Sequence, residues 1–199
     1  MNSMKDLVIH HGARFSVTGS CHELQLPNGS GLLVDCGLFQ GNEAGQSLEI
    51  DFPVKHLCGL VITHVHIDHV GRLPYLLAAG FSGPIFCSDA SAKLLPTVLR
   101  DALQISFTKD RRQIERFIDL LEERLQPLRY NQWHKVRTNS SDLLAIRLKP
   151  AGHILGSAYV ECRLRKDDRG EPVKVLFSGD LGAPYAPLLP APKSPYSAD

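Results

Sequence analysis

Four side chains that can bind a metal ion occur within six consecutive residues, at His64, His66, Asp68 and His69. An apolar run typical of a buried strand precedes them and a helical pattern follows, so they belong to a strand-to-helix loop at a sheet edge. In an extended chain His64 and His66 point to the same side, while Asp68 and His69 begin the turn and face a neighbouring point. Imidazole and carboxylate donors suit zinc, and a catalytic zinc keeps one position for water. The spacing therefore predicts a catalytic zinc site rather than ordinary polar loop residues.

Two more polar residues stand at comparable places, each just after a predicted strand. His153 follows the strand that ends near Lys149, and Asp180 follows the strand that ends near Phe177. A glycine precedes each of them, which lets the backbone turn sharply where the strand ends. Because sheet proteins build their sites on loops at strand ends, we expect both residues to join the 64–69 cluster.

Asp35 ends an apolar strand in the sequence Val34-Asp35-Cys36-Gly37. A carboxylate at this place either caps the turn or supports a metal ligand from behind through a hydrogen bond. We expect the second of these roles for Asp35.

The elements that must position these residues follow the order strands, then helices, then strands. The first three strands suggest an antiparallel meander, and Lys166–Gly170 a hairpin turn between the last two. Thr108 is the expected N-cap of the last helix, and Pro127 is expected to end it. This pattern predicts an α+β fold in which layered sheets carry helices on their outer faces. Strands are expected at 7–11, 23–26, 31–35, 57–62, 85–87, 143–149, 158–164 and 173–177, and helices at about 73–80, 89–105 and 108–126.

The composition is that of an ordinary soluble protein of about one domain, with 199 residues of which 43% are hydrophobic and 22% charged. The formal net charge is +1, so the basic excess of many nucleic-acid binders is missing, and composition neither supports nor excludes RNA as substrate. Five scattered cysteines indicate reduced thiols. Neither a signal peptide nor a membrane-spanning apolar run is visible, so we expect a cytoplasmic protein that does not associate with membranes.

Three sequence strings resemble the metallo-β-lactamase superfamily, and within it the β-CASP branch of RNA-processing nucleases. They are THVHIDHVGRLP at 63–74, AGHILGSA at 151–158 and SGDLG at 178–182. The opening strands, with DCGLFQG at 35–41, are similar to the same branch. The likeness covers about residues 8–190, and it implies a layered sandwich of the metallo-β-lactamase type.

The resemblance also implies how the site works. His64, His66 and His153 would bind one zinc ion, Asp68 and His69 would bind a second, and Asp180 would bridge both. A hydroxide between the two ions would attack a phosphodiester bond, most often of single-stranded RNA, with Asp68, His69 and Asp180 at the reacting centre. The family resemblance thus predicts a ribonuclease, of either exonuclease or endonuclease type.

Members of the β-CASP branch continue past a proline-rich stretch into an inserted domain that clamps nucleic acid, and then return to complete the hydrolase domain. This chain has five prolines between Pro184 and Pro195. We therefore expect residues 1–183 to be the N-terminal part of the hydrolase domain, incomplete at its C-terminus, and residues 184–199 to be a linker toward an absent insertion. The second metal site would then lack one histidine, and exposed apolar surface would favour self-association.

Two alternatives remain open at this point. One is a thioester hydrolase similar to glyoxalase II, but there two glycines usually follow the last histidine of the motif, whereas Val70 and Gly71 follow here. The other is an inactive fragment of the nuclease. Arg14 and Arg72 either contact phosphate or serve as surface or packing residues. His10 or His11, at a strand end near Gly12, could approach the site, but we expect both to be ordinary strand residues. The histidines without a motif partner, expected to be structural, are His22, His56 and His134.

Overall fold

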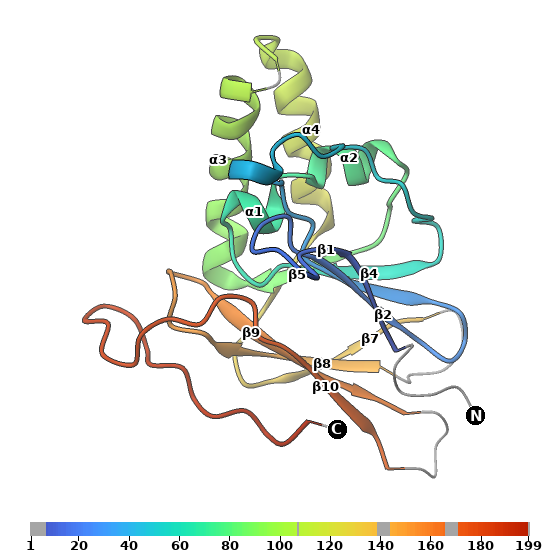
Figure 1. Ribbon diagram of the computed structural model, residues 1–199, viewed down its shortest axis with the longest axis vertical. Coiled ribbons are helices and arrows are strands. Elements are labelled where there is room, and N and C mark those ends of the chain that lie inside the picture. The colour runs from blue at the N-terminus through green and yellow to red at the C-terminus, as the bar shows by residue number, and fades with distance from the viewer. Residues whose placement is uncertain (1–6, 107, 139–143, 166–170, 199) are drawn as a thin grey trace.

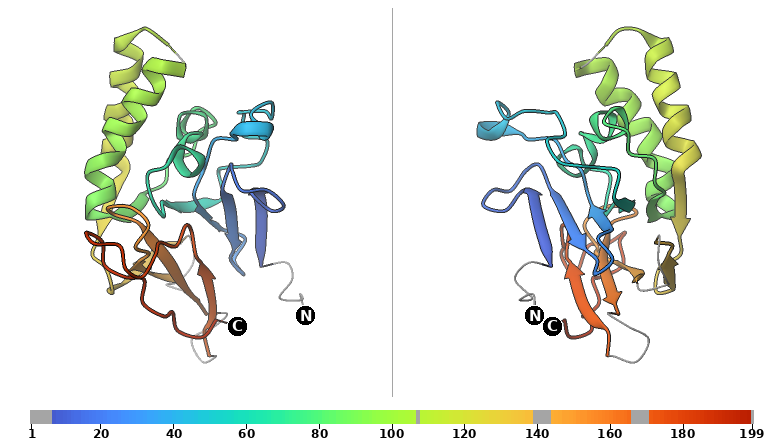
Figure 2. Two further views of the ribbon diagram at one scale, coloured as in Figure 1. Left: turned by 60° about the vertical axis from the view of Figure 1, so that its left-hand side comes forward. Right: turned by 90° about the vertical axis from the view of Figure 1, so that its right-hand side faces the viewer.

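Two β-sheets face each other, and the helices cover the outer face of the first sheet (Figure 1; Figure 2). The computed structural model describes residues 7–106, 108–138, 144–165 and 171–198. The first sheet has the strand order β1 (Val8–Gly12), β2 (Cys21–Gln25), β3 (Gly31–Val34), β4 (Leu57–Val61), β5 (Ile85–Ser88), β6 (Leu125–Leu128). The second has the order β10 (Val173–Phe177), β9 (Ala158–Leu164), β8 (Leu144–Pro150), β7 (Trp133–Val136).

The helices are α1 (Ile67–Val70), α2 (Leu73–Ala78), α3 (Asp89–Ser106) and α4 (Arg111–Arg124), with a short 3-10 helix at Gly41–Glu43. In the described part of the chain they lie on one side of the paired sheets only (Figure 2). None of the helices described is long and apolar enough to span a membrane.

The middle strands of the first sheet contribute to two separate cores. On β3, Leu32 packs between the two sheets and Leu33 packs against the helices. On β4, Val61 packs between the two sheets and Leu60 packs against the helices. Side chains alternate in direction along a strand, so a strand covered on both faces must be apolar at every position. The continuous apolar runs of the sequence are therefore explained by burial on both faces.

The predicted meander is confirmed, because β1 pairs with β2 and β2 with β3 in antiparallel register. From β3 to β6 the strands run parallel. The strands expected at 158–164 and 173–177 occur with those bounds. The predicted hairpin turn at 166–170 lies outside the described residues.

Two expectations about the last helix were wrong. Its N-cap is Asp110, whose carboxylate accepts a hydrogen bond of 2.9 Å from the Arg112 amide. The hydroxyl of Thr108 accepts the Asp110 amide instead, at 3.0 Å, and so forms the turn that precedes the cap. At the other end the helix stops at Arg124, and Pro127 lies within strand β6. That strand lies at the edge of its sheet, where proline, which has no amide hydrogen to donate, is tolerated.

The proline-rich segment after residue 184 lies along the second sheet (Figure 1). The Tyr159 hydroxyl donates a hydrogen bond of 2.8 Å to the Lys193 carbonyl, and the Tyr196 amide donates one of 3.2 Å to Glu161. The Tyr196 ring also lies 4.6 Å from the guanidinium of Arg147. The described end of this segment is thus held at several points.

We predict that Tyr196→Ala accelerates trypsin cleavage after Lys193 about fivefold, because about 1 kcal/mol of cation–π attraction is lost. Mass spectrometry of released peptide would measure the rate. Tyr185→Ala is the matched control, since the Tyr185 side chain is 84% exposed. Equal cleavage of parent and Tyr196→Ala would mean that Tyr196 does not hold the segment.

Candidate metal centre

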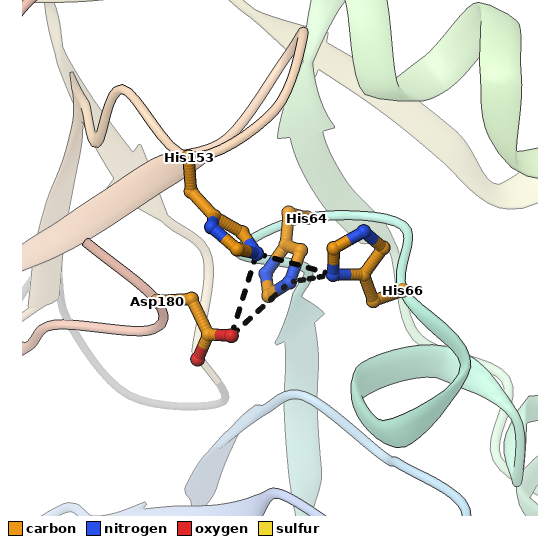
Figure 3. A group of neighbouring side chains, drawn as sticks. All are labelled: His64, His66, His153 and Asp180. Atoms are coloured by element: carbon orange, nitrogen blue, oxygen red, sulfur yellow. Dashed lines mark hydrogen bonds and ion pairs between the residues drawn. The ribbon is translucent and has the colours of Figure 1, made fainter. Parts of the chain in front are cut away.

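Loops from both sheets carry the predicted ligands to one place. His64 and His66 lie between β4 and α1, His153 lies between β8 and β9, and Asp180 follows β10. Figure 3 shows the four side chains converging from these loops. An inter-sheet hydrogen bond of 2.8 Å, from the Ala158 amide to the Thr63 carbonyl, fixes the loops relative to each other.

The first group of donors is compact. One ligand atom from each of His64, His66, His153 and Asp180 lies within 4.8 Å of all the others. The Nδ1 atom of His66 is 3.1 Å from Nε2 of His64 and 3.2 Å from Nε2 of His153. Oδ2 of Asp180 is 3.5 Å from Nε2 of His153 and 3.9 Å from Nε2 of His64. Three nitrogens and one carboxylate oxygen are a donor set that zinc accepts.

A second group of donors shares Asp180 with the first. Oδ1 of Asp180 lies 3.4 Å from Nε2 of His69, and Oδ2 of Asp68 lies 3.8 Å from the same nitrogen. The two oxygens of Asp180 therefore face two different sets of donors. This is the arrangement that a carboxylate between two cations requires, so the residues present fit a dinuclear centre.

Asp35 is buried behind this second group, with 1% of its surface exposed. Its Oδ2 atom is 2.7 Å from Nδ1 of His69. The Thr63 amide donates a hydrogen bond of 2.8 Å to Oδ1. With its Nδ1 proton donated to Asp35, His69 would have Nε2 available to bind a metal ion beside Asp180. Asp35 thus contacts a predicted ligand, as the sequence led us to expect.

Thr63 has a positioning role that the sequence analysis missed. Its hydroxyl donates to Oδ2 of Asp35 at 2.8 Å and lies 3.1 Å from Nδ1 of His64. A hydroxyl that donates to Asp35 is free to accept from His64, which leaves Nε2 of His64 unprotonated and directed at the centre. The signal for this role was the position of Thr63, directly before the first histidine of the motif.

Glycine and serine residues shape the loops that carry His153 and Asp180. Gly179 has a φ of +48°, and a Cβ atom there would lie 2.8 Å from the Thr63 side chain. Gly152 has a φ of +71°. The sharp turns expected before His153 and Asp180 are thus present, at a conformation that favours glycine. The hydroxyl of Ser157 accepts a hydrogen bond of 3.0 Å from the His153 amide and so closes the loop.

Burial favours the neutral form of His64 and His66, which is the form that binds metal. Burial, and to a smaller extent the neighbouring imidazoles, lower the pKa of His64 to about 2. Burial also lowers the pKa of His66, as does the adjacent His153. For His69 burial acts in the same direction, but the hydrogen bond and the charge of Asp35 outweigh it and raise the pKa.

A cavity of about 420 Å³ opens beside the second group of donors, and both His69 and Asp180 line it. His10 and His22 line the same cavity, with their Nδ1 atoms 2.9 Å apart. Of the other residues singled out in the sequence, Arg72 is buried and donates a hydrogen bond of 2.7 Å to the Gly37 carbonyl, so it is a packing residue.

His11 and His56 lie apart from the candidate centre and share one buried acid. Each places its Nε2 atom 2.8 Å from a different oxygen of Glu23. Burial alone would raise the pKa of Glu23, but the hydrogen bonds from the two histidines outweigh it and lower the pKa. These contacts join β1, β2 and the segment before β4, which is the structural role expected of both histidines.

Comparison with known proteins gives one family and several named relatives. The model of the metallo-beta-lactamase superfamily matches residues 17–166. Ribonuclease TTHA0252 of Thermus thermophilus is 36% identical over 198 residues, which are 96% of this chain and 42% of that protein. Transcription termination factor FttA of Methanocaldococcus jannaschii is 31% identical, over 89% of this chain and 27% of that protein. The chain thus spans less than half the length of these relatives.

Solved structures support the fold. A metallo-beta-lactamase of Cronobacter sakazakii with a HARLDQ motif superposes with a TM-score of 0.52 and 16% identity, over 87% of this chain and 57% of that one. MEM-A1, a subclass B3 metallo-beta-lactamase from a soil metagenome library, gives a TM-score of 0.51, also at 16% identity, over 86% of this chain and 59% of that one.

We predict that Asp35→Asn weakens zinc binding by about 10- to 100-fold, the usual effect of removing a group that orients a ligand. The asparagine amide would face Nδ1 of His69 and favour the tautomer that carries its proton on Nε2. Competition with a zinc-chelating dye would measure the affinity. Asp101→Asn on the exposed face of α3 is the control. Unchanged zinc affinity in a folded Asp35→Asn protein would remove Asp35 from the site.

Proposed function

The chain belongs to the metallo-β-lactamase superfamily, and we propose that it carries the zinc-binding centre of a hydrolase that cleaves phosphodiester bonds in single-stranded RNA. In this proposal His64, His66 and His153 hold one zinc ion, Asp68 and His69 hold a second, and Asp180 lies between them. The protein would act in RNA processing in the cytoplasm. The five free cysteines, four of them buried, agree with a reducing compartment.

One observation carries the proposal: the two oxygens of Asp180 face two separate sets of donors. Oδ2 lies near His64 and His153, whereas Oδ1 lies 3.4 Å from His69. A single structural zinc ion is bound by four protein ligands, and such a site has no further donor side chains beside them. Five donor side chains around one shared carboxylate favour two ions and hydrolysis.

The names of the relatives favour RNA as the substrate. Two of them are named ribonucleases: that of Thermus thermophilus, and Probable RNase MJ4 of Methanocaldococcus jannaschii, which is 28% identical over 87% of this chain. The sequence strings at 63–74, 151–158 and 178–182 resemble the β-CASP nucleases. Since this chain corresponds to less than half of these relatives, the activity of the 199-residue chain by itself is part of the proposal.

In the proposed reaction the metal ions, the residues that orient the ligands and the exposed ligand have different roles. Zinc at such a centre lowers the pKa of water and neutralises charge that develops on a phosphoryl oxygen. Asp35 and Thr63 hold the imidazoles of His69 and His64 in the tautomers that direct Nε2 to the centre. Asp180, which is 43% exposed at its side chain, forms the solvent side of the site, where the substrate phosphate would enter. Buried His64 and His69 form its floor.

We predict that the metal-replete chain binds about two zinc ions and that His66→Ala and Asp180→Ala each bind fewer. RNA cleavage should fall more than about 100-fold in both variants. This loss is larger than the loss expected when a residue that only orients a ligand through a hydrogen bond is changed. Elemental analysis would give zinc per chain, and gel electrophoresis of end-labelled single-stranded RNA would give the rate. Asp51→Asn, an exposed carboxylate outside both donor groups, is the control.

Three results would contradict the proposal in different ways. A parent protein without zinc would remove the metal centre altogether. One zinc without cleavage would favour an inactive fragment with an unfilled second site. Hydrolysis of a glutathione thioester in place of RNA would favour the thioesterase alternative.

A further inference from the structure

The loop between β1 and β2 lies on the rim of the cavity that His69 and Asp180 line. Ala13, Ser16 and Val17 of this loop line the cavity together with His69 and Asp180. Any substrate group that extends from the candidate centre into this cavity therefore passes beside the loop.

The base of the loop is fixed to the candidate centre. The Ser20 amide donates a hydrogen bond of 2.9 Å to the carbonyl of Asp68, a predicted ligand. The Thr18 hydroxyl accepts a hydrogen bond of 3.1 Å from the Gln40 amide and also contacts the Glu43 carboxylate. The position of the loop relative to the second group of donors is thus set by direct contacts.

The tip of the loop, in contrast, presents apolar and cationic groups to solvent. Phe15 is 91% exposed and Val17 is 87% exposed. The guanidinium of Arg14 lies 4.9 Å from the centroid of the Phe15 ring and so covers one side of it. A single exposed apolar side chain needs no explanation, but two beside a cation on the rim of a candidate active site mark a contact surface.

We propose that Arg14 and Phe15 form a nucleotide clip, in which Phe15 stacks on a base next to the scissile phosphate and Arg14 binds a backbone phosphate. The inference rests on the proposed function, because it takes single-stranded RNA as the substrate. Every base has a flat π face, so an aromatic ring holds single strands with little sequence preference. Arginine adds a delocalised cation that pairs with phosphate.

The nearly neutral charge of the whole chain favours a local contact of this kind. With a formal net charge of +1, this chain has no overall basic excess to attract a polyanion. Stacking and individual cations would then contribute to RNA binding, and Arg14 and Phe15 offer both, next to the cavity-lining residues Ala13, Ser16 and Val17.

The test compares two fluorescent oligonucleotides on the zinc-loaded chain by anisotropy. One is an oligouridylate with phosphorothioate linkages that slow cleavage, and the other has the same backbone with stable abasic spacers. We expect Phe15→Ala to weaken oligouridylate binding about 5- to 150-fold, the range for loss of one base–aromatic stack. Binding of the abasic strand should not change, and Phe15→Trp should bind as the parent does.

Arg14→Gln should weaken binding of both strands by a similar factor and reduce the slope of log affinity against log salt by about 0.7, the value for one phosphate of a single strand. Ile105→Ala is the matched control, since Ile105 is 71% exposed in the last turn of α3. Zinc per chain should equal that of the parent in all of these variants.

The outcomes separate the clip from the function on which it rests. If the parent binds and cleaves oligouridylate and Phe15→Ala binds it equally well, the clip is wrong and the nuclease proposal stands. If Phe15→Ala weakens binding of both strands alike, the proposal that Phe15 stacks on a base is wrong. If the parent binds zinc but neither binds nor cleaves RNA, the nuclease proposal fails and the clip fails with it, and the loop tip is then a surface for another protein.

Discussion

The buried carboxylate of Asp35 is the contact on which the candidate centre depends. Taking a carboxylate out of water costs several kcal/mol unless charge or hydrogen bonds compensate for it. Here Thr63 donates through both its amide and its hydroxyl, and His69 lies 2.7 Å away. Asp35 itself has a φ of +60°, a conformation that aspartate tolerates better than most residues. The end of β3, the end of β4 and helix α1 are thus joined at one point, directly behind the metal ligands.

The distance between the two halves of the site is set by the packing of the sheets. His64, His66 and His69 belong to the first sheet and its helix, whereas His153 and Asp180 belong to loops of the second. The core between the sheets, with Val61 and Phe86 on one side and Ile146 and Val160 on the other, holds these loops at a fixed separation. Because protein interiors are close-packed, a change of volume in this core would move the two sets of donors relative to each other.

The chain combines this rigid candidate centre with an exposed side, which in the proposed function faces the substrate. The ligands of the floor are buried and held by hydrogen bonds, while Asp180, Arg14 and Phe15 face solvent. This division suits a site that must fix metal ions precisely in place yet accept a long, flexible polymer. In the proposed function, a nearly neutral chain would attract RNA through the bound metal ions and through local contacts at the cavity rim.

The sequence by itself determined which residues are candidate ligands, because four metal-binding side chains in six residues, and two more that follow glycines after strands, are local patterns. It also determined most strand positions, because alternation and apolar runs follow from burial on one or two faces. Tertiary structure alone decided that the oxygens of Asp180 face two donor groups, that His66 offers Nδ1, and that Thr63 links Asp35 to His64. It alone decided that Pro127 lies in a strand and that the segment after residue 184 rests on the second sheet. Those features depend on how distant segments pack and pair, and neither the propensity nor the spacing of nearby residues contains that information.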